Sequence, residues 1–346
     1  MDWLTETIKE MDQGYYKQAL NRQAQLTKPL GSLGLLEEIA IKIASMQKTE
    51  RPEIERIYVS VFAADHGIAK ESVSAFPQVV TTEMVKNFVA EGAAVNVLSR
   101  FVKADFEVID VGLMTDINIE RVIVDRVSNG TANFAKQAAM TEKQMSAALL
   151  AGKSAVARAL KQQAQIFIGG EMGVANTTSA SAIAVALTGF SVQELTGAGT
   201  GLANDAINHK VSVIENALLL HKSYLDTASK ILQYLGGFEI AALVGAYIFA
   251  AQKGLPVLID GFIASVAALL AVNINPACQR WFFYAHCSQE KGHRLVLQQL
   301  KAKPLLDLGM RLGEASGAVA AVPLLQIACK LHNEMATFEQ AKITIQ

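Results

Sequence analysis

Short apolar runs alternate with longer segments of helical periodicity through the middle of the chain. The runs cover residues 57–64, 106–111, 165–168, 256–259 and 281–285, and each ends near Gly, Asp, His or Ser. Segments of helix length, rich in Ala, Leu and Val, separate them, which is the pattern of strand–helix–strand crossover units. We therefore predict an α/β fold with a mostly parallel sheet covered by helices on both faces.

The two ends of the chain have a different pattern. Residues 1–50 carry apolar positions at three- and four-residue spacing, with a turn at 28–34, and helical spacing returns from about Pro304. Neither a fixed-period repeat nor a low-complexity linker divides the sequence. We expect residues 50–303 to form the sheet domain and residues 1–49 plus 304–346 to form a small helical domain.

Composition narrows the class of protein. Although 51% of the residues are hydrophobic, no uncharged apolar run reaches the roughly 18 residues of a membrane span. The N-terminus lacks a basic region followed by an apolar stretch, so we expect a soluble protein without a cleaved leader. The formal net charge is -1 and there is no dense Lys/Arg stripe, which favours a small-molecule substrate over nucleic acid.

The three cysteines, Cys278, Cys287 and Cys329, are an odd number in a long chain, which is typical of a reducing cytoplasm. His286, Cys287 and His293 lie close together in sequence and resemble a ligand set. Their spacing matches no familiar zinc pattern and a second Cys pair is missing, so we favour a buried thiol and two polar loop histidines over a metal site.

Polar residues gather after the predicted strands. Asp65 follows the first, Asp110 ends the second, and Asp260 and Ser288 follow later ones, while residues 169–173 follow the third. Ligands of open parallel sheets bind beyond the carboxyl ends of the strands. We expect the functional site at this edge.

Two glycine-containing segments are candidates for binding the substrate. Residues 197–201 precede a helical pattern that contains Lys210, and glycines at a helix start let backbone amides approach a phosphate. The spacing is not that of a dinucleotide fingerprint, so we interpret the segment as a phosphate site, with a tight turn as the alternative. Residues 170–180 join a strand to a helix; Asn176, Thr177 and Thr178 are helix-cap candidates, and the carboxylate of Glu171 is placed to orient a substrate.

Glu314 lies at the start of a strongly apolar helix. The helix dipole favours its ionised form, whereas burial among apolar neighbours raises its pKa. On these grounds alone the residue is either a helix cap or a catalytic acid–base group.

Six segments in sequence order together resemble the nicotinate-nucleotide:dimethylbenzimidazole phosphoribosyltransferase family. They are 27–34 (TKPLGSLG), 64–67 (ADHG) with 73–78 (VSAFPQ), 170–180 (GEMGVANTTSA), 199–201 (GTG), 260–262 (DGF) and 313–314 (GE). The resemblance extends through nearly the whole chain. It implies a Rossmann-like sheet domain, a small helical domain built from both termini, and a homodimer.

The resemblance also assigns roles to residues of this sequence. Glu314 corresponds to the general base of the family. The expected substrate-binding residues are Glu171, Gly173 and Asn176 near the nucleotide and nicotinate, Gly199, Gly201, Lys210 and Ser288 at the phosphate, Ser74 and Gln78 beside the benzimidazole, and Asp260. Three positions depart from the family pattern: Phe76 replaces a frequent Tyr, and Ala175 and Ala315 replace frequent glycines. These departures affect base preference and turn geometry rather than the proposed base.

The activity implied is transfer of the 5-phosphoribosyl group from nicotinate mononucleotide to 5,6-dimethylbenzimidazole, without a cofactor or metal. Its products are α-ribazole 5′-phosphate and nicotinate, for nucleotide-loop assembly of cobalamin. A phosphoribosyltransferase that uses the pyrophosphate-bearing donor is disfavoured because Asp260 stands alone, without the adjacent acidic residue usual in that class. A nicotinamide-dinucleotide oxidoreductase is disfavoured by the incomplete fingerprint. A non-catalytic or partner-dependent subunit, and a related enzyme that uses adenine or a phenol, stay open as alternatives.

Overall fold

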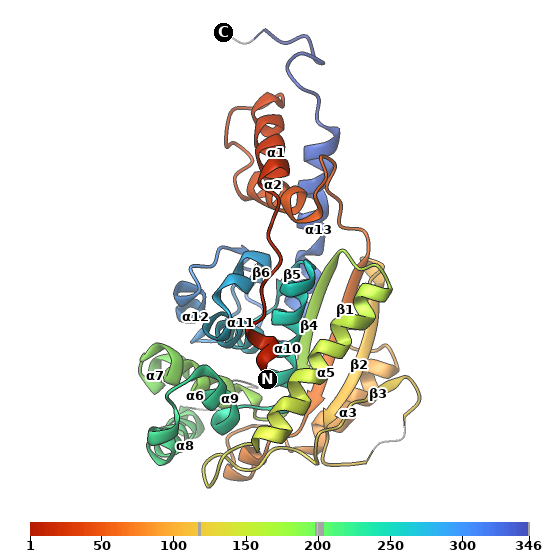
Figure 1. Ribbon diagram of the computed structural model, residues 1–346. Coiled ribbons are helices and arrows are strands. Elements are labelled where there is room, and N and C mark those ends of the chain that lie inside the picture. Colours follow the sequence, from red (N-terminus) through yellow and green to blue (C-terminus); the bar gives the residue numbers. More distant parts are fainter. Residues whose placement is uncertain (117–118, 198, 200–203, 345–346) are drawn as a thin grey trace.

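A parallel sheet forms the centre of the protein. The computed structural model describes residues 1–116, 119–197, 199 and 204–344. Its seven strands have the order β3-β2-β1-β4-β5-β6-β7, and every neighbouring pair is parallel. The strands are β1 (Ile57–Ala64), β2 (Asp105–Gly112), β3 (Val122–Val124), β4 (Ile166–Met172), β5 (Val257–Ile259), β6 (Phe282–His286) and β7 (Pro304–Leu306) (Figure 1). The predicted α/β class is confirmed.

Helices connect and cover the strands. The α-helices are α1 (Gln13–Gln25), α2 (Leu35–Gln47), α3 (Val79–Val89), α4 (Ala94–Phe101), α5 (Glu142–Lys161), α6 (Asn176–Thr188), α7 (Val192–Leu195), α8 (Asn204–His221), α9 (Ala228–Leu235), α10 (Phe238–Lys253), α11 (Phe262–Ile274), α12 (His293–Gln299) and α13 (Ser316–Glu334). Short 3₁₀ helices are η1 (Asp2–Thr5), η2 (Gly67–Glu71), η3 (Lys222–Tyr224) and η4 (Pro276–Trp281). Within the described residues, no helix combines the length and apolar character needed to cross a membrane.

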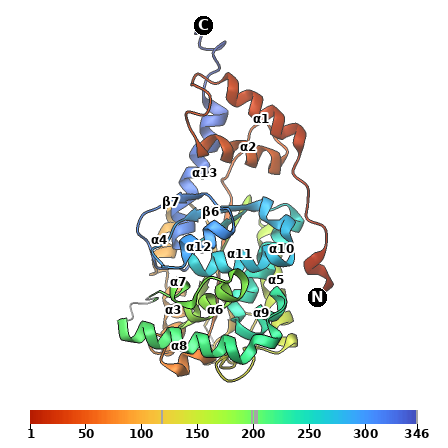
Figure 2. The ribbon, with the colours of Figure 1, turned by 90° about the vertical axis from the view of Figure 1, so that its left-hand side faces the viewer.

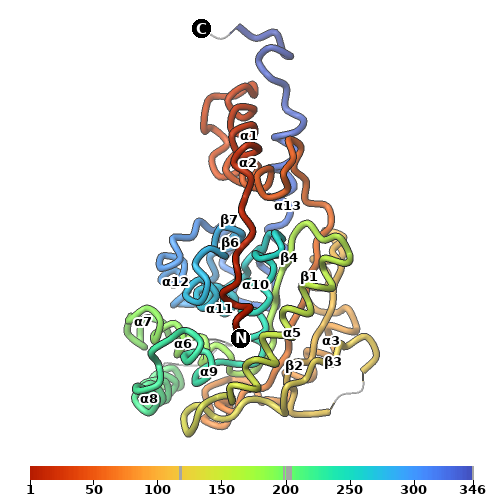
Figure 3. The backbone as a smooth tube through the Cα atoms, in the orientation of Figure 1, coloured from red at the N-terminus to blue at the C-terminus, as the bar shows by residue number. Residues whose placement is uncertain are grey.

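Two glycines in β4 show how closely helices approach the sheet. A Cβ atom on Gly169 would lie 2.5 Å from the Leu243 side chain of α10, and one on Gly170 would lie 2.9 Å from Ala315, just before α13. Since successive residues of a strand face opposite sides, α10 covers one face of the sheet and the start of α13 covers the other. The tube in Figure 3 shows α5 and α10 side by side in front of β1 and β4.

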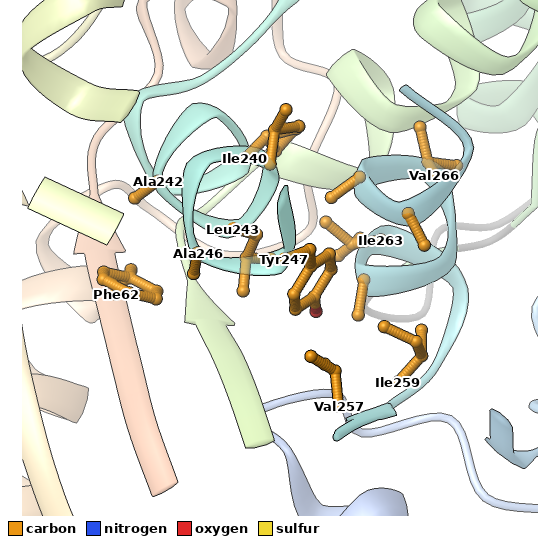
Figure 4. Packing of buried hydrophobic residues seen from close by; sticks show 14 of the residues in the cluster. Phe62, Ile240, Ala242, Leu243, Ala246, Tyr247, Val257, Ile259, Ile263 and Val266 are labelled. Carbon is orange, nitrogen blue, oxygen red and sulfur yellow. The ribbon is translucent and has the colours of Figure 1, made fainter. Parts of the chain in front are cut away.

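The core between α10, α11 and the sheet consists mainly of apolar side chains. In Figure 4 the ring of Tyr247 lies among Leu243, Val257, Ile259 and Ile263, all of which are buried. Burial raises the pKa of the Tyr247 phenol well above its ordinary value, so the ring is a neutral core residue. This packing fixes the carboxyl ends of β4 and β5 relative to each other.

Helices α1 and α2 project beyond the sheet, next to the end of α13. Figure 2 shows α1 and α2 packed against the end of α13, whose first turns lie on the sheet. The Arg22 guanidinium donates a hydrogen bond to the His332 carbonyl at 2.7 Å, and the Gln23 amide lies 2.9 Å from His332 Nδ1. Leu26 and Thr337 form an isolated antiparallel bridge. The two ends of the chain are therefore held together by direct contacts.

Several local expectations were wrong. Helix does not return at Pro304, because Pro304–Leu306 forms β7 at the edge of the sheet. Leu4 and Ile8, near the N-terminus, are buried in the large hydrophobic core. The domain boundaries at 49/50 and 303/304 stay a prediction.

The third predicted strand is longer than expected, because Gly169, Gly170 and Glu171 continue it. Their glycines are not turn signals here; they leave room for the helices on either face. The short edge strand β3 was not predicted at all, since three partly exposed residues give no recognisable run.

Candidate active site

A cavity of about 760 Å³ opens at the carboxyl edge of the sheet. The chain passes from β1 outward to β2 and β3 and then returns to the other side of β1 as β4, so the sheet has its switch point between β1 and β4. Segments that follow these two strands and β5, β6 and β7 form the walls. This is the place where parallel α/β sheets bind ligands.

The structure brings together part of the predicted site. Glu171, Gly173, Asn176, Gly199, Ser288 and Glu314 line the cavity. Lys210 lies immediately behind this lining, and Gly201 falls outside the described residues. Asp260, Ser74 and Gln78 are not lining residues: the Gln78 amide donates to the His66 carbonyl at 3.1 Å, and the Ser74 hydroxyl accepts from the Phe76 amide at 3.4 Å.

Glu314 lies in an unusual turn between β7 and α13. Gly313, Glu314 and Ala315 have successive φ angles of 85°, 62° and 69°, all in the left-handed region. Side chains other than glycine adopt this region at a cost, and such conformations cluster at functional sites. The turn holds the Glu314 carboxyl on the cavity wall, with only 7% of the residue exposed. Burial, reinforced by the negative charge of Asp260, raises the Glu314 pKa to about 7.

Glu171 at the end of β4 supports this turn. Its carboxylate accepts hydrogen bonds from the Asn176 side-chain amide and, at 3.5 Å, from the backbone nitrogen of Glu314. A Cβ atom on Gly313 would lie 2.7 Å from Glu171 Oε1, so the close approach requires glycine there. Burial, followed by the charges of Glu239 and Asp260, raises the pKa of Glu171 well above its ordinary value.

Asp260 holds the start of α13 in place behind the cavity wall. Its Oδ1 atom accepts a hydrogen bond from the Ala318 amide at 2.7 Å, at the start of α13, and lies 3.6 Å from His286 Nε2. A carboxylate at this end of a helix is favoured by the helix dipole. Burial nevertheless raises the Asp260 pKa. Asp260 thus anchors the helix that follows the Glu314 turn, rather than facing the cavity.

A buried cation marks another part of the cavity. Lys210 of α8 is 1% exposed, and its Nζ atom donates to the Thr177 hydroxyl at 2.8 Å. A Cβ atom on Gly199 would lie 3.4 Å from the same Nζ. Burial lowers the Lys210 pKa to about 8, an effect opposed by the charge of Glu290. The Lys210 ammonium therefore loses its proton at a pH not far above neutral. In its charged form it is placed to attract an anion.

The apolar part of the cavity wall comes from α3 and the residues before it. Phe76, Val80 and Met84 contribute apolar surface to the cavity, and Phe262 of α11 adds a second aromatic ring. Such a combination of apolar walls and a few polar groups is usual for sites that bind flat aromatic ligands.

The helix-cap prediction for 176–178 was wrong. Ala175 is the N-cap of α6, with φ of 74°, and no side chain caps this helix. The Asn176 amide is instead bonded to Glu171, and the Thr177 hydroxyl accepts from Lys210. The polar groups of Asn176 and Thr177 therefore bond to side chains at the cavity rather than to the backbone at the start of α6.

We expected the two histidines near Cys287 to lie in polar loops, but they do not. His286 ends β6 and His293 begins α12; they are 2% and 0% exposed. Among the described residues, no group of three or more His, Cys, Asp or Glu side chains is arranged to hold a metal ion.

Comparison with known proteins settles the family. The phosphoribosyltransferase family model DBI_PRT matches residues 8–343. The chain belongs to this phosphoribosyltransferase family. The family assignment agrees with the resemblance seen in the sequence and with an enzyme that acts on small molecules.

Individual members of the family are similar to this chain over nearly their full length. Nicotinate-nucleotide–dimethylbenzimidazole phosphoribosyltransferase of Pseudomonas fluorescens Pf-5 is 53% identical over 342 residues, which cover 99% of this chain and 97% of the relative. The protein of the same name from Azotobacter vinelandii is 52% identical over 344 residues, covering 99% and 98%. The crystal structure of CobT from Thermus thermophilus superimposes with a TM-score of 0.92 at 38% identity, covering 96% of this chain and all of that one.

Several cavity residues had no role in the sequence analysis. Val80 and Met84 lie on α3, where apolar spacing gives no sign that one face borders a cavity. Glu290 and Arg311 are lining charges whose only sequence signal is their closeness to Ser288 and Glu314.

Proposed function

We propose that this enzyme transfers the 5-phosphoribosyl group of nicotinate mononucleotide to 5,6-dimethylbenzimidazole, releasing nicotinate and α-ribazole 5′-phosphate. The relatives that share about half of its residues carry the name of this reaction. The observation that carries the proposal is the Glu314 carboxyl, with its pKa raised to about 7, on the wall of a cavity that also has a buried ammonium.

Lys210 and its neighbours bind the phosphate of the mononucleotide. The ammonium supplies charge, while Gly199 lacks a side chain that would fill the space beside it. Ser288 contributes a hydroxyl from the segment after β6. Charge-assisted hydrogen bonds of this kind are stronger than neutral ones. Gly201 is assigned to the same phosphate site from the sequence alone.

Glu171, Gly173 and Asn176 surround the ribose and nicotinate. Gly173 is a point of close approach, because a Cβ atom there would lie 2.5 Å from the Ala64 carbonyl oxygen. Glu171 holds the Glu314 turn and contributes a carboxyl to the cavity, while Asp260 acts indirectly by anchoring α13.

The benzimidazole lies against Phe76, Val80 and Met84. Gln78 and Ser74 border this region by fixing the backbone around His66 and Phe76, instead of contacting the base directly. A wall built of apolar side chains discriminates modestly between flat bases, by about 1–3 kcal/mol per methylene-sized difference. Adenine or a phenol is therefore the second candidate acceptor.

The chemistry uses Glu314 as general base. The lone pair of one benzimidazole nitrogen forms the new bond to C1′ from the face opposite nicotinate. The bond from C1′ to the pyridinium nitrogen breaks, and its electron pair neutralises the nicotinate ring. The second benzimidazole nitrogen loses its proton to the Glu314 carboxylate. Inversion at C1′ gives the α-linked product, and fixing both rings in line supplies much of the remaining rate enhancement.

The active enzyme is a cytoplasmic homodimer without a cofactor or metal, in this proposal. Its division into a sheet domain, 50–303, and a helical domain, 1–49 plus 304–346, follows the sequence pattern. The non-catalytic or partner-dependent subunit is less favoured, because Glu314 and Glu171 line one cavity in this chain and Lys210 lies directly behind its wall.

An assay of the purified chain tests the proposed function. Nicotinate mononucleotide is incubated with 5,6-dimethylbenzimidazole, adenine or phenol, and products are separated by chromatography. We expect nicotinate and the α-ribotide in equal amounts, with benzimidazoles as the best acceptors. Absence of product with every base would contradict the proposal, and activity that appears only with a second subunit would support the partner-dependent alternative.

A further inference from the structure

His293 is a completely buried side chain next to the cavity, and none of the proposed chemistry uses it. It begins α12 and is 0% exposed. Its Nδ1 atom lies 2.8 Å from the backbone nitrogen of Ser288 and 2.9 Å from the Ser288 hydroxyl. Its Nε2 atom lies 2.9 Å from the hydroxyl of Ser265 on α11. Both ring nitrogens thus have serine partners.

The backbone contact determines which nitrogen carries the ring proton. A backbone N–H only donates, so the Nδ1 atom of His293 accepts from Ser288 and is unprotonated. The proton of the neutral ring is therefore on Nε2, which donates to the Ser265 hydroxyl. Burial, reinforced by electrostatic interaction with the neighbouring His286 and Arg294 side chains, lowers the His293 pKa to about 3, so the ring stays neutral at physiological pH.

The unprotonated Nδ1 atom also accepts from the Ser288 hydroxyl at 2.9 Å, because that hydroxyl carries the only hydrogen between the two atoms. The Ser288 amide donates to the same Nδ1 atom and keeps it paired. The hydroxyl hydrogen can therefore turn to a ligand oxygen in the cavity, which Ser288 lines, without leaving Nδ1 unpaired. A protonated ring would instead place an N–H against the Ser288 amide.

We propose that His293 is a positioning residue that fixes Ser288 for a phosphate oxygen of the bound nucleotide. It does so from behind the cavity wall, through the Ser288 backbone, and it has no contact with the reacting atoms. The inference rests on the proposed function for the identity of the nucleotide, while the geometry of the three residues is independent of it.

Kinetic and binding measurements on paired variants test the inference. His293→Ala removes the acceptor, and we expect the KM for nicotinate mononucleotide to rise about tenfold with kcat within about threefold of wild type. His293→Asn keeps an acceptor oxygen near the Nδ1 position, and it restores most of the lost KM. His332→Ala is the matched control, because it removes an equally buried ring far from the cavity; we expect a lower Tm and an unchanged KM.

A double-mutant cycle separates positioning from a general effect on folding. If His293 acts through Ser288, His293→Ala has little further effect on KM in a Ser288→Ala background. Additive effects, an unchanged KM in His293→Ala, or failure of His293→Asn to recover binding would each overturn the inference.

Calorimetric titration with nicotinate mononucleotide and with ribose 5-phosphate provides the same comparison without turnover. Weaker binding of both ligands to His293→Ala, in an enzyme that shows no transfer activity, would preserve the inference while the proposed function fails. If wild type binds neither ligand, or if both ligands bind equally to wild type and His293→Ala, the role of His293 is excluded.

Discussion

Glu171 Oε1 lies 3.5 Å from the backbone nitrogen of Glu314 and accepts its hydrogen bond. The bond joins the end of β4 to the turn that precedes α13, across a sequence separation of 143 residues. Because the turn has three successive residues of positive φ, its conformation depends on such contacts from the surrounding structure. The position of the proposed base is thus a property of the sheet edge as a whole.

Activity should depend on pH through Glu314 and Lys210. The base works when ionised, so kcat/KM should rise with pH through the Glu314 pKa of about 7. It should fall again as Lys210 loses its proton near its pKa of about 8. Initial rates at subsaturating mononucleotide, measured from about pH 5.5 to 9.5, check this profile. A rate independent of pH below 7 would contradict the assignment of Glu314.

The charge of Lys210 should matter mainly for binding. Lys210→Met keeps an unbranched side chain but removes the ammonium, and we expect the KM for nicotinate mononucleotide to rise about 10- to 100-fold. The alkaline limb of the pH profile should disappear with it. Lys330→Met, which changes an exposed lysine of α13, serves as control. Unaltered mononucleotide binding in Lys210→Met would exclude a phosphate site at this ammonium.

Ala175 and Ala315 occupy positions that favour glycine, with φ of 74° and 69°. Left-handed backbone costs a non-glycine residue about 1–2 kcal/mol, and the added chain entropy of glycine offsets about 0.5–1 kcal/mol of the relief. Each Ala→Gly variant should therefore be more stable by roughly 0.5–1 kcal/mol. Urea denaturation checks this, with Ala180→Gly inside α6 as a destabilising control. Loss of stability at positions 175 and 315 would show that strain there is already relieved.

The pH dependence of folding stability should also reveal the raised pKa of the Glu314 carboxyl. Its folded-state pKa of about 7 is above the ordinary value of 4.5, so its stabilising protonation is complete below about pH 4.5 and is lost as the pH rises through 7. Glu314→Gln removes this dependence. We expect the variant to gain stability relative to wild type between about pH 5 and 8, on the order of 2 kcal/mol. Thermal unfolding of wild type and Glu314→Gln at about pH 5 and about pH 8 measures this gain. The same stability difference between the two proteins at both pH values would show that the Glu314 pKa is not raised.

The sequence was sufficient for the buried strands but not for the edges of the sheet. The run at Ile57–Ala64 is continuous and apolar because both of its faces are covered. Val122–Val124 and Pro304–Leu306 are three-residue edge strands, too short to produce such a pattern. Gly169 and Gly170 resemble turn residues, and only the packing of α10 and the Glu314 turn explains why they lie within a strand.

The site was predictable where a motif lies directly on the cavity wall, as for Glu171 and Glu314. It was less predictable where a side chain arrives from a distant element. Met84 reaches the cavity from the face of an otherwise ordinary helix, and the second ring nitrogen of His293 meets Ser265 of α11, which is 28 residues away in the sequence. Such approaches are set by tertiary packing, for which neither periodicity nor spacing gives a signal.

The central claim is that Glu314 takes the proton of the attacking base. The most direct test compares wild type with Glu314→Gln at about pH 8, with Glu334→Gln, an exposed change at the end of α13, as control. Turnover of nicotinate mononucleotide with 5,6-dimethylbenzimidazole should fall about 10²- to 10⁴-fold in Glu314→Gln alone. The dissociation constant of the base should stay within about threefold, because the amide keeps the shape of the side chain. Near-normal turnover in Glu314→Gln, with the fold intact, would contradict the account.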